Sequence, residues 1–247
     1  MHVIIPVAGY ATRLYPLTEN TPKALLPING ITILDTILEN AEKISVVNKV
    51  TLVSNDKFCE NFKSWAKTYK GRLHISIIND KTTTNEERLG AIGDINLAIE
   101  SKNINEDILV LAGDNYFTYD LKKVYEYYKE INTNLIIGSR VGNEILKQRK
   151  YGIVEIDSTG KVIGFEEKPE NPKSNIVVPA IYFYKKETVP LFRVFLNEGN
   201  NKDAMGGIIS YLYSRTPIHC YFADGEFTDI GTLETYNELN KKLRSKI

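Results

Sequence analysis

The chain has 247 residues, and 43% of them are hydrophobic, which is enough for one sizeable α/β domain with its own core. Its 31 basic and 31 acidic residues give a formal net charge of zero, which argues against a nucleic-acid polymer as the partner. No apolar run approaches bilayer-spanning length and no secretion signal is recognisable, so we expect a cytoplasmic protein with no membrane partner. Cys59 and Cys220 lie far apart, outside any Cys-x-x-Cys or Cys/His cluster, and we expect both to be buried thiols.

The first predicted element is a buried strand over Val3–Val7, which leads into a loop suited to phosphate binding. Small residues in the segment 8–11 allow a tight turn whose N–H groups form a concave anion site, and Arg13 and Lys23 add two cations. Three prolines stiffen the loop and exclude a helix: Pro16, Pro22 and Pro27. The loop lacks both the Walker sequence and the dinucleotide-binding glycines, which disfavours a P-loop kinase or an NAD enzyme. We interpret it as a polyphosphate-binding loop.

Helices and strands alternate from this loop to about residue 115. The pattern of apolar residues predicts, in order, a helix over 31–44, a strand over 50–53, a helix over 58–69, a strand over 74–78, a helix from 89 to 101 and a strand over 108–111. This alternation predicts an α/β fold, a Rossmann-like three-layer sandwich with a mixed, mainly parallel central sheet. Gly90, at the start of one helix, permits close approach by a flat ligand such as a nucleobase.

Two carboxylates occupy positions suited to a divalent cation. Asp114 follows the strand over 108–111 directly, and Asp229 lies in a short loop before the last predicted helix. Two carboxylates that converge on Mg²⁺ would leave most coordination positions to water and to substrate phosphate, as this ion prefers. An aspartate at a strand end is also a common turn former, so the pair predicts a metal site only if the two side chains meet.

The second half changes from alternating helices and strands to a partly antiparallel pattern. Residues 151–156 and 161–165 predict a hairpin that overhangs the site, and the charged segment 166–169 ends its second strand. The remaining predicted elements are helices over 121–131, 187–196 and 204–213, strands over 135–138, 176–184 and 218–222, and a final helix capped by Thr232. We expect one domain over residues 1–247.

Five motifs in this order resemble the sugar-1-phosphate nucleotidylyltransferase family, and the branch they resemble most is glucose-1-phosphate thymidylyltransferase. The motifs are Gly-Tyr-Ala-Thr-Arg-Leu-Tyr-Pro-Leu-Thr (9–18), Thr-Pro-Lys (21–23), Gly-Asp-Asn (113–115), Glu-Glu-Lys-Pro (166–169) and Asp-Ile-Gly-Thr (229–232). The resemblance covers essentially the whole chain. It implies a nucleotide-binding half over about 1–115, a sugar-binding half over about 116–247, Mg²⁺ as cofactor, and a homo-oligomer as one frequent assembly of the family.

The implied reaction joins a sugar 1-phosphate, glucose 1-phosphate in this branch, to a nucleoside triphosphate such as dTTP or UTP, and releases pyrophosphate. The family assigns catalytic roles to Arg13, Lys23, Asp114, Lys168 and Asp229, and a metal to Asp114 and Asp229. It places the nucleotide against Ala8, Gly9, Tyr10, Arg13, Lys23, Gly90 and Asp114, and the sugar phosphate against Gly152, Glu167 and Lys168. Because the attacking phosphate is already anionic, no general base is required, and catalysis rests on positioning and charge neutralisation.

Some positions depart from the family pattern. Ala11 replaces a usual second loop glycine, which is tolerable unless that position needs a positive φ. The glutamine that thymidylyl enzymes often use against the pyrimidine is missing from the segment 89–93, so CTP or GTP with another sugar or alcohol phosphate remains an alternative. A non-catalytic nucleotide-sugar sensor is a second alternative. A glycosyltransferase is disfavoured because the segment 114–116 lacks the Asp-x-Asp pattern. We see no hexapeptide repeat after Gly231, so we do not expect a β-helix acyltransferase domain.

Overall fold

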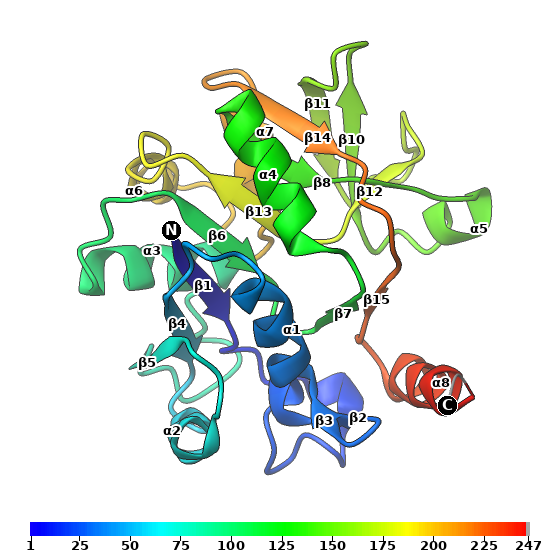
Figure 1. Ribbon diagram of the computed structural model, residues 1–247. Coiled ribbons are helices and arrows are strands. Elements are labelled where there is room, and N and C mark those ends of the chain that lie inside the picture. Colours follow the sequence, from blue (N-terminus) through cyan, green and yellow to red (C-terminus); the bar gives the residue numbers. More distant parts are fainter. Residues whose placement is uncertain (246–247) are drawn as a thin grey trace.

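A seven-stranded mixed sheet forms the centre of the molecule (Figure 1). The computed structural model describes residues 1–245. The strands lie in the order β14 (Ile218–Tyr221), β8 (Asn134–Ile137), β13 (Ile181–Tyr184), β6 (Ile108–Leu111), β1 (His2–Pro6), β4 (Lys49–Ser54) and β5 (His74–Asn79). The pairs β5–β4, β4–β1, β1–β6 and β8–β14 are parallel, whereas β13 runs antiparallel to both of its neighbours. The predicted mixed, mainly parallel sheet is therefore confirmed.

Helices cover both faces of this sheet, as the alternating pattern predicts. One face packs against α1 (Ile33–Glu42), α2 (Cys59–Thr68) and α4 (Leu121–Ile131), and the other against α3 (Ala91–Ser101), α6 (Leu191–Asn197) and α7 (Gly207–Leu212). Strand β1 shows the division, because Val3 and Ile5 contact the first core and Ile4 contacts the second. A strand buried on both faces has a continuous run of apolar residues, and this run allowed the strand to be predicted from the sequence.

A four-stranded antiparallel sheet stands beside the central one. It has the order β11 (Val162–Glu167), β10 (Gly152–Ile156), β12 (Ile176–Val178) and β9 (Ser139–Arg140), and β10 and β11 form the predicted hairpin. The prediction of one strand over 176–184 is wrong, because the chain breaks at Pro179 and Ala180 and divides into β12 and β13. Ala180 has a φ of +48°, which a continuous strand does not allow. One apolar run thus serves two different sheets.

Two small ribbons and the remaining helices complete the fold. Strand β7 (Asn115–Phe117) pairs antiparallel with β15 (Phe227–Asp229), and β2 (Pro27–Ile28) pairs with β3 (Ile31–Thr32). The other elements are α5 (Asn143–Leu146), α8 (Leu233–Arg244) and the 3₁₀ helices η1 (Thr12–Leu14) and η2 (Lys23–Leu25). Helix α8 begins with the predicted Thr232 cap, whose hydroxyl accepts from the backbone N–H of Thr235.

Several elements are shorter than predicted. Helices α6 and α7 begin after Pro190 and Gly206, because proline favours a helix start and glycine weakens a helix interior. Both cysteines are buried free thiols, as predicted. Within residues 1–245, none of the helices combines the length and the apolar character needed to cross a bilayer.

Candidate active site

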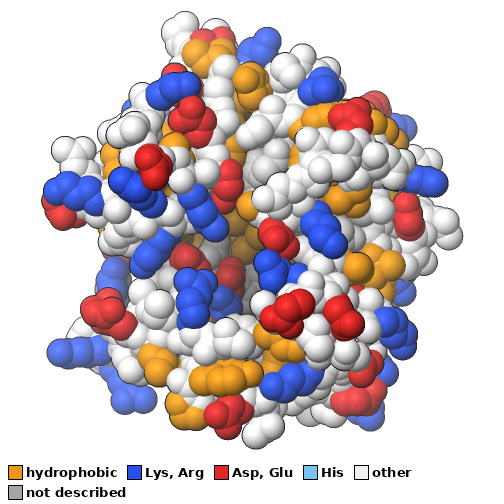
Figure 2. All heavy atoms as spheres, turned by 180° about the vertical axis from the view of Figure 1, so that it is seen from behind, with side chains coloured by type: hydrophobic (Ala, Val, Ile, Leu, Met, Phe, Trp, Pro, Cys, Tyr) orange, Lys and Arg blue, Asp and Glu red, His pale blue; other side chains and the backbone are white. Residues whose placement is uncertain are grey.

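A cavity of about 470 Å³ opens at the carboxyl ends of β1 and β6. The space-filling view shows one face of the molecule hollowed near its centre, with basic and acidic side chains together around the hollow (Figure 2). The cavity is lined by every site residue predicted from the sequence: Ala8, Gly9, Tyr10, Arg13, Lys23, Gly90, Asp114, Gly152, Glu167, Lys168 and Asp229. Residues from seven separate stretches of the chain are thus brought together in one place.

The loop after β1 has the geometry of a tight turn at Ala11. This residue has φ +50° and ψ +39°, the left-handed region that glycine adopts most easily. Two bonds hold it there, because the carbonyl of Ala11 accepts from the Thr18 hydroxyl at 2.8 Å and from the Leu14 backbone N–H at 3.0 Å. Position 11 therefore requires a positive φ, and this backbone conformation is strained for an alanine.

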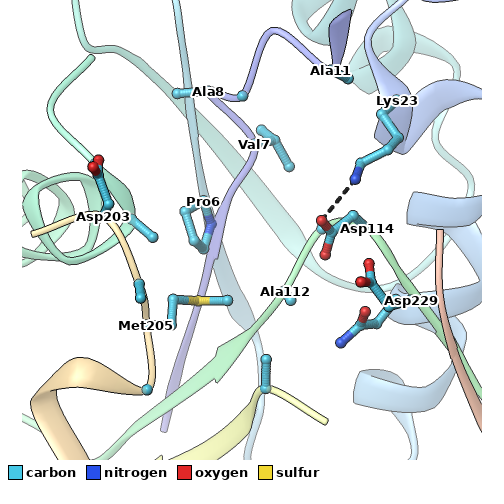
Figure 3. A pocket seen from close by; sticks show the side chains of 18 of the residues that line it. Pro6, Val7, Ala8, Ala11, Lys23, Ala112, Asp114, Asp203, Met205 and Asp229 are labelled. Atoms are coloured by element: carbon cyan, nitrogen blue, oxygen red, sulfur yellow. Dashed lines mark hydrogen bonds and ion pairs between the residues drawn. The ribbon is translucent and has the colours of Figure 1, made fainter. Parts of the chain in front are cut away.

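Lys23 lies against the acidic side of the cavity. Its Nζ donates to Asp114 Oδ2 at 2.7 Å and to the carbonyl of Ile230 at 3.0 Å, and Figure 3 shows this pair pointing into the cavity beside Asp229. The lysine side chain is 15% exposed and the aspartate side chain 38%, so a ligand can reach the carboxylate more readily than the ammonium. Lys23 thus bonds directly to Asp114 and to the backbone carbonyl of the residue after Asp229.

The two carboxylates converge because of the ribbon formed by β7 and β15. Asp229 pairs in register with Asn115, and the N–H of Ile230 donates to the carbonyl of Asp114 at 3.1 Å. Burial, and then the like charge of Asp114, raise the pKa of Asp229, while Lys23 and Arg13 oppose the rise. A methyl group built on Gly231 would lie 3.6 Å from Asp229 Oδ2 and 3.8 Å from Arg13 Nη2, so Arg13 flanks the same carboxylate.

This donor set fits Mg²⁺. Within residues 1–245 no cluster of three or more His, Cys, Asp or Glu side chains is placed to hold a metal ion. The candidate site at this position consists of Asp114 and Asp229. Mg²⁺ is commonly bound through one or two carboxylates together with water and substrate phosphate. Asp114 and Asp229 repel each other, and Mg²⁺ held by these two side chains would offset that repulsion.

Glu167 and Lys168, at the end of β11, face the cavity from the second sheet. Their side chains approach to 3.8 Å, and burial raises the pKa of Glu167 while Lys168 opposes the rise. Gly206 permits this placement, because a Cβ there would lie 2.3 Å from Glu167 Oε2. Gly152 also lines the cavity. The ring of Phe165 packs against it so closely that a Cβ at this position would lie 2.3 Å from the ring.

The loops after β1 and β5 form the remaining wall. The carbonyl of Ala8 accepts from the buried Asn55 amide at 2.8 Å, and the Tyr10 hydroxyl donates to the carbonyl of Thr82 at 3.1 Å. Gly90, the residue before α3, has φ +79°, and a Cβ on it would lie 2.6 Å from the carbonyl of Lys202. Backbone atoms and small residues such as Ala8 and Gly90 therefore form part of this wall, which leaves room for a flat ligand.

Sequence reasoning missed four charged residues of the cavity wall: Arg88, Asp94, Lys150 and Asp203. Arg88 and Asp203 form a two-bond pair at 3.1 and 3.0 Å across 115 positions of sequence, for which the sequence gives no signal. Asp94 is 4% exposed in the first turn of α3. Its signal was available, because it is a carboxylate at a buried helical position between Ile92 and Ile95.

The family model described as Nucleotidyl transferase matches residues 2–246. The chain belongs to this family. A putative mannose-1-phosphate guanyltransferase from Sulfolobus acidocaldarius is 28% identical over 97% of this chain and 62% of its own length. The bifunctional protein GlmU from Methanocaldococcus jannaschii is 27% identical over 100% and 55%, and a glucose-1-phosphate adenylyltransferase from Clostridium novyi is 28% identical over 98% and 66%. This nucleotidyl transferase chain thus spans about half to two thirds of the length of these relatives.

Solved structures share the fold at low sequence identity. A UDP-glucose pyrophosphorylase complexed with UDP-glucose superimposes with a TM-score of 0.82 at 21% identity, covering 100% of this chain and 99% of the other. A putative glucose-1-phosphate thymidylyltransferase from Bacillus anthracis gives a TM-score of 0.78 at 20% identity, covering 99% and 96%. The predicted fold and the family resemblance are both confirmed.

Proposed function

We propose that the chain is a Mg²⁺-dependent sugar-1-phosphate nucleotidylyltransferase that joins glucose 1-phosphate to dTTP or UTP and releases pyrophosphate, a step of nucleotide-sugar biosynthesis. One observation carries this proposal: Lys23, Asp114 and Asp229 meet at one side of a cavity that Glu167 and Lys168 line from the second sheet. Cations and metal-binding carboxylates beside a second anion-binding lysine suit a reaction between two phosphates.

In the proposed reaction, an oxygen of the sugar phosphate attacks the α-phosphorus of the triphosphate. A new P–O bond forms, the bond between the α-phosphorus and the bridging oxygen breaks, and pyrophosphate leaves with the electron pair. The attacking phosphate is ionised at neutral pH, so no proton has to be removed. The protein accordingly needs to align two anions and to offset their repulsion.

The placement of each charged residue supports a proposed role. Arg13 and Lys23 are proposed to bind the triphosphate and to stabilise the charge that develops on the leaving pyrophosphate. Asp114 and Asp229 are proposed to hold Mg²⁺, which when bound neutralises phosphate oxygens. Lys168 is proposed to bind the sugar phosphate, and Glu167 to accept hydrogen bonds from sugar hydroxyls.

The uncharged residues would shape the two substrate sites. Ala8, Gly9, Tyr10 and Gly90 are proposed to line the nucleoside site, where small side chains leave room for a flat base. Gly152 is proposed to lie near the sugar, although its packing against Phe165 already explains the glycine.

The choice of glucose and of dTTP or UTP rests on the closest motif resemblance and on two structural neighbours. Those neighbours are described as a UDP-glucose pyrophosphorylase and a glucose-1-phosphate thymidylyltransferase. A second candidate is the same reaction with GTP and mannose 1-phosphate, because the relative from Sulfolobus acidocaldarius is described as a putative mannose-1-phosphate guanyltransferase.

Pyrophosphate release by the purified protein with Mg²⁺ tests the proposal. The assay covers dTTP, UTP, CTP, GTP and ATP, each with glucose 1-phosphate and with a panel of other sugar 1-phosphates. We expect release that requires both substrates and is fastest with glucose 1-phosphate and dTTP or UTP. Release with GTP and mannose 1-phosphate would keep the reaction class and overturn the base and the sugar. Nucleotide binding with no release from any pair would favour the sensor.

Variants identify the residues responsible. Asp114→Ala is expected to lower turnover by about 100-fold or more, since it removes a group that offsets charge in the transition state. Asp224→Ala is the matched control, because Asp224 is an exposed carboxylate in the segment that leads to β15. Near-normal turnover in Asp114→Ala would contradict the assigned metal site.

A further inference from the structure

Asp94 is a buried carboxyl group for which the fold supplies no partner. It lies in the first turn of α3 and lines the cavity, yet it is 4% exposed. Its Oδ1 atom is fully buried and accepts no hydrogen bond, and neither of its oxygens bonds to another described residue. Among the described residues, Asp94 Oδ1 is the one buried side-chain nitrogen or oxygen atom without a hydrogen-bond partner.

Such a group lowers the stability of the folded chain. Burying a polar group without a hydrogen-bond partner is unfavourable, so folded proteins rarely keep such a group. Asp80, after β5, is the neighbouring acid, and Lys202, before α7, is the neighbouring base. Burial first, and then Asp80, raise the pKa of Asp94 to about 8, while Lys202 opposes the rise. At neutral pH the group is therefore chiefly an uncharged carboxyl, with one O–H donor and one carbonyl acceptor.

Asp94 belongs to a part of the cavity wall away from the proposed phosphate-binding residues. Helix α3 starts at Gly90, and a Cβ on Gly90 would lie 2.9 Å from Asp203 Oδ1. Figure 3 shows Asp203 on the opposite side of the cavity from Lys23, Asp114 and Asp229. A nucleotide whose phosphates lie against Lys23 would extend its base toward this far wall.

We propose that Asp94 reads the nucleobase, its carbonyl accepting from the N3–H of uracil or thymine and its O–H donating to a neighbouring base carbonyl. This inference rests on the proposed function. The imide edge of these bases presents one donor beside an acceptor, which matches an uncharged carboxyl. Guanine also presents O6 beside N1–H, but it adds a second donor, the N2 amino group. Only an ionised carboxylate, which accepts at both oxygens, would bind N1–H and the N2 amino group together.

Nucleotide binding is the first test. Binding of UTP and dTTP with Mg²⁺ is measured by calorimetry at pH 7 for the wild type, Asp94→Asn and Asp94→Ala. The asparagine amide also offers one donor and one acceptor, so Asp94→Asn should bind within about threefold of wild type. Asp94→Ala removes the hydrogen bonds and should bind about tenfold more weakly. Glu100→Gln is the matched control, because it changes an exposed carboxylate of the same helix to an amide.

The pH dependence separates the two forms of the carboxyl group. Between about pH 7 and pH 9, wild-type affinity for UTP should fall relative to Asp94→Asn, because ionisation removes the O–H donor. A wild type that prefers GTP, loses GTP binding in Asp94→Asn and binds GTP more tightly as pH rises would overturn the proposed base and assign the ionised form.

Stability of the nucleotide-free protein distinguishes base recognition from a structural role. The folded chain keeps the Asp94 proton to about pH 8, whereas an unfolded aspartate loses it near pH 4. The folded state therefore binds more protons in that interval, and through this group the free energy of unfolding decreases as pH rises from about 4 to 8. Asp94→Asn should remove this decrease, and its Tm at pH 8 should exceed that of the wild type.

The outcomes separate this inference from the proposed function. Failure of the wild type to bind or turn over any nucleotide would overturn the proposed function. Normal turnover with UTP or dTTP, together with equal nucleotide affinity in wild type, Asp94→Asn and Asp94→Ala, would overturn the role of Asp94 alone. Loss of affinity accompanied by a lower Tm in both variants would assign Asp94 to structure.

Discussion

Ala11 and Lys168 hold left-handed backbone conformations beside the cavity, with φ of +50° at both. Residues other than glycine rarely adopt this region, and such conformations gather where surrounding contacts impose them. At Ala11 the imposed contacts are the two bonds to its carbonyl. This strained residue lies in the loop that we propose to bind phosphate through its N–H groups, so a local loss of stability coincides with a proposed binding site.

Ala11→Gly should increase stability. Glycine removes the left-handed penalty of about 1 to 2 kcal/mol but gives the unfolded chain more freedom, so the net gain expected is about 0.5 to 1 kcal/mol in the free energy of unfolding. Urea denaturation followed by circular dichroism measures it. Ala8→Gly is the matched control, because Ala8 is a buried alanine of the same loop outside the left-handed region and should be destabilised. A loss of stability in Ala11→Gly would contradict the strain argument.

At the scale of elements, the ribbon of β7 and β15 brings Asp114 and Asp229 together. Thr228 lies opposite Tyr116 in this ribbon. A backbone hydrogen bond flanks this pair on each side: the N–H of Ile230 donates to the carbonyl of Asp114 at 3.1 Å, and the N–H of Thr118 donates to the carbonyl of Glu226 at 2.9 Å. Each strand has only three residues, so no side-chain pattern distinguishes it from a loop. The convergence of the carboxylates therefore depends on a pairing that the sequence conceals.

Thr228→Pro should separate the two carboxylates while the central sheet stays folded. Proline removes a backbone donor from the ribbon, and a displacement of about 1 Å at a reacting centre can lower turnover by about 100-fold. Pyrophosphate release measures the effect, and far-UV circular dichroism checks the fold. Thr228→Val keeps a β-branched residue and should stay active. If the proline variant unfolds, Thr228→Gly replaces it; normal turnover in a folded proline variant would show that the ribbon does not position the carboxylates.

At the scale of the whole molecule, the two halves predicted from the sequence share one sheet. Strand β6 from the first half pairs with β13 from the second over four residue pairs, and β8 and β14 continue the sheet beyond β13. The hydrophobic cores on both faces also contain residues from both halves. A continuous sheet and shared cores couple the halves, and we therefore expect one cooperative folding unit.

Urea unfolding should expose both cysteines in a single transition. Cys59 lies in the first half and Cys220 in the second, at 2% and 4% exposure, so thiol labelling at each urea concentration reports on both halves. Mass analysis of the labelled peptides should give the same midpoint for the two thiols. A midpoint for Cys220 clearly below that of Cys59 would instead show that the halves unfold separately and form two domains.

The sequence by itself determined the layers of the fold and the residues of the proposed site. Fully buried strands such as β1 and helices such as α4 have continuous or periodic apolar patterns that survive without tertiary contacts. The spaced motifs likewise contained most of the predicted residues that the cavity brings together, among them Arg13, Lys23, Asp114, Lys168 and Asp229. Sequence patterns fail at Pro179 and Ala180, where one apolar run crosses between two sheets, because burial alone does not say which sheet a residue joins.

Only the tertiary structure decided which charges meet. The pairing of Lys23 with Asp114, of Asp114 with Asp229 and of Arg88 with Asp203 joins residues 91 to 115 positions apart. Such contacts are set by sheet order and by short backbone pairings, which leave no periodic trace in the sequence. The lack of a partner for Asp94 was equally hidden, because a missing hydrogen bond becomes visible only when every neighbouring atom has its place.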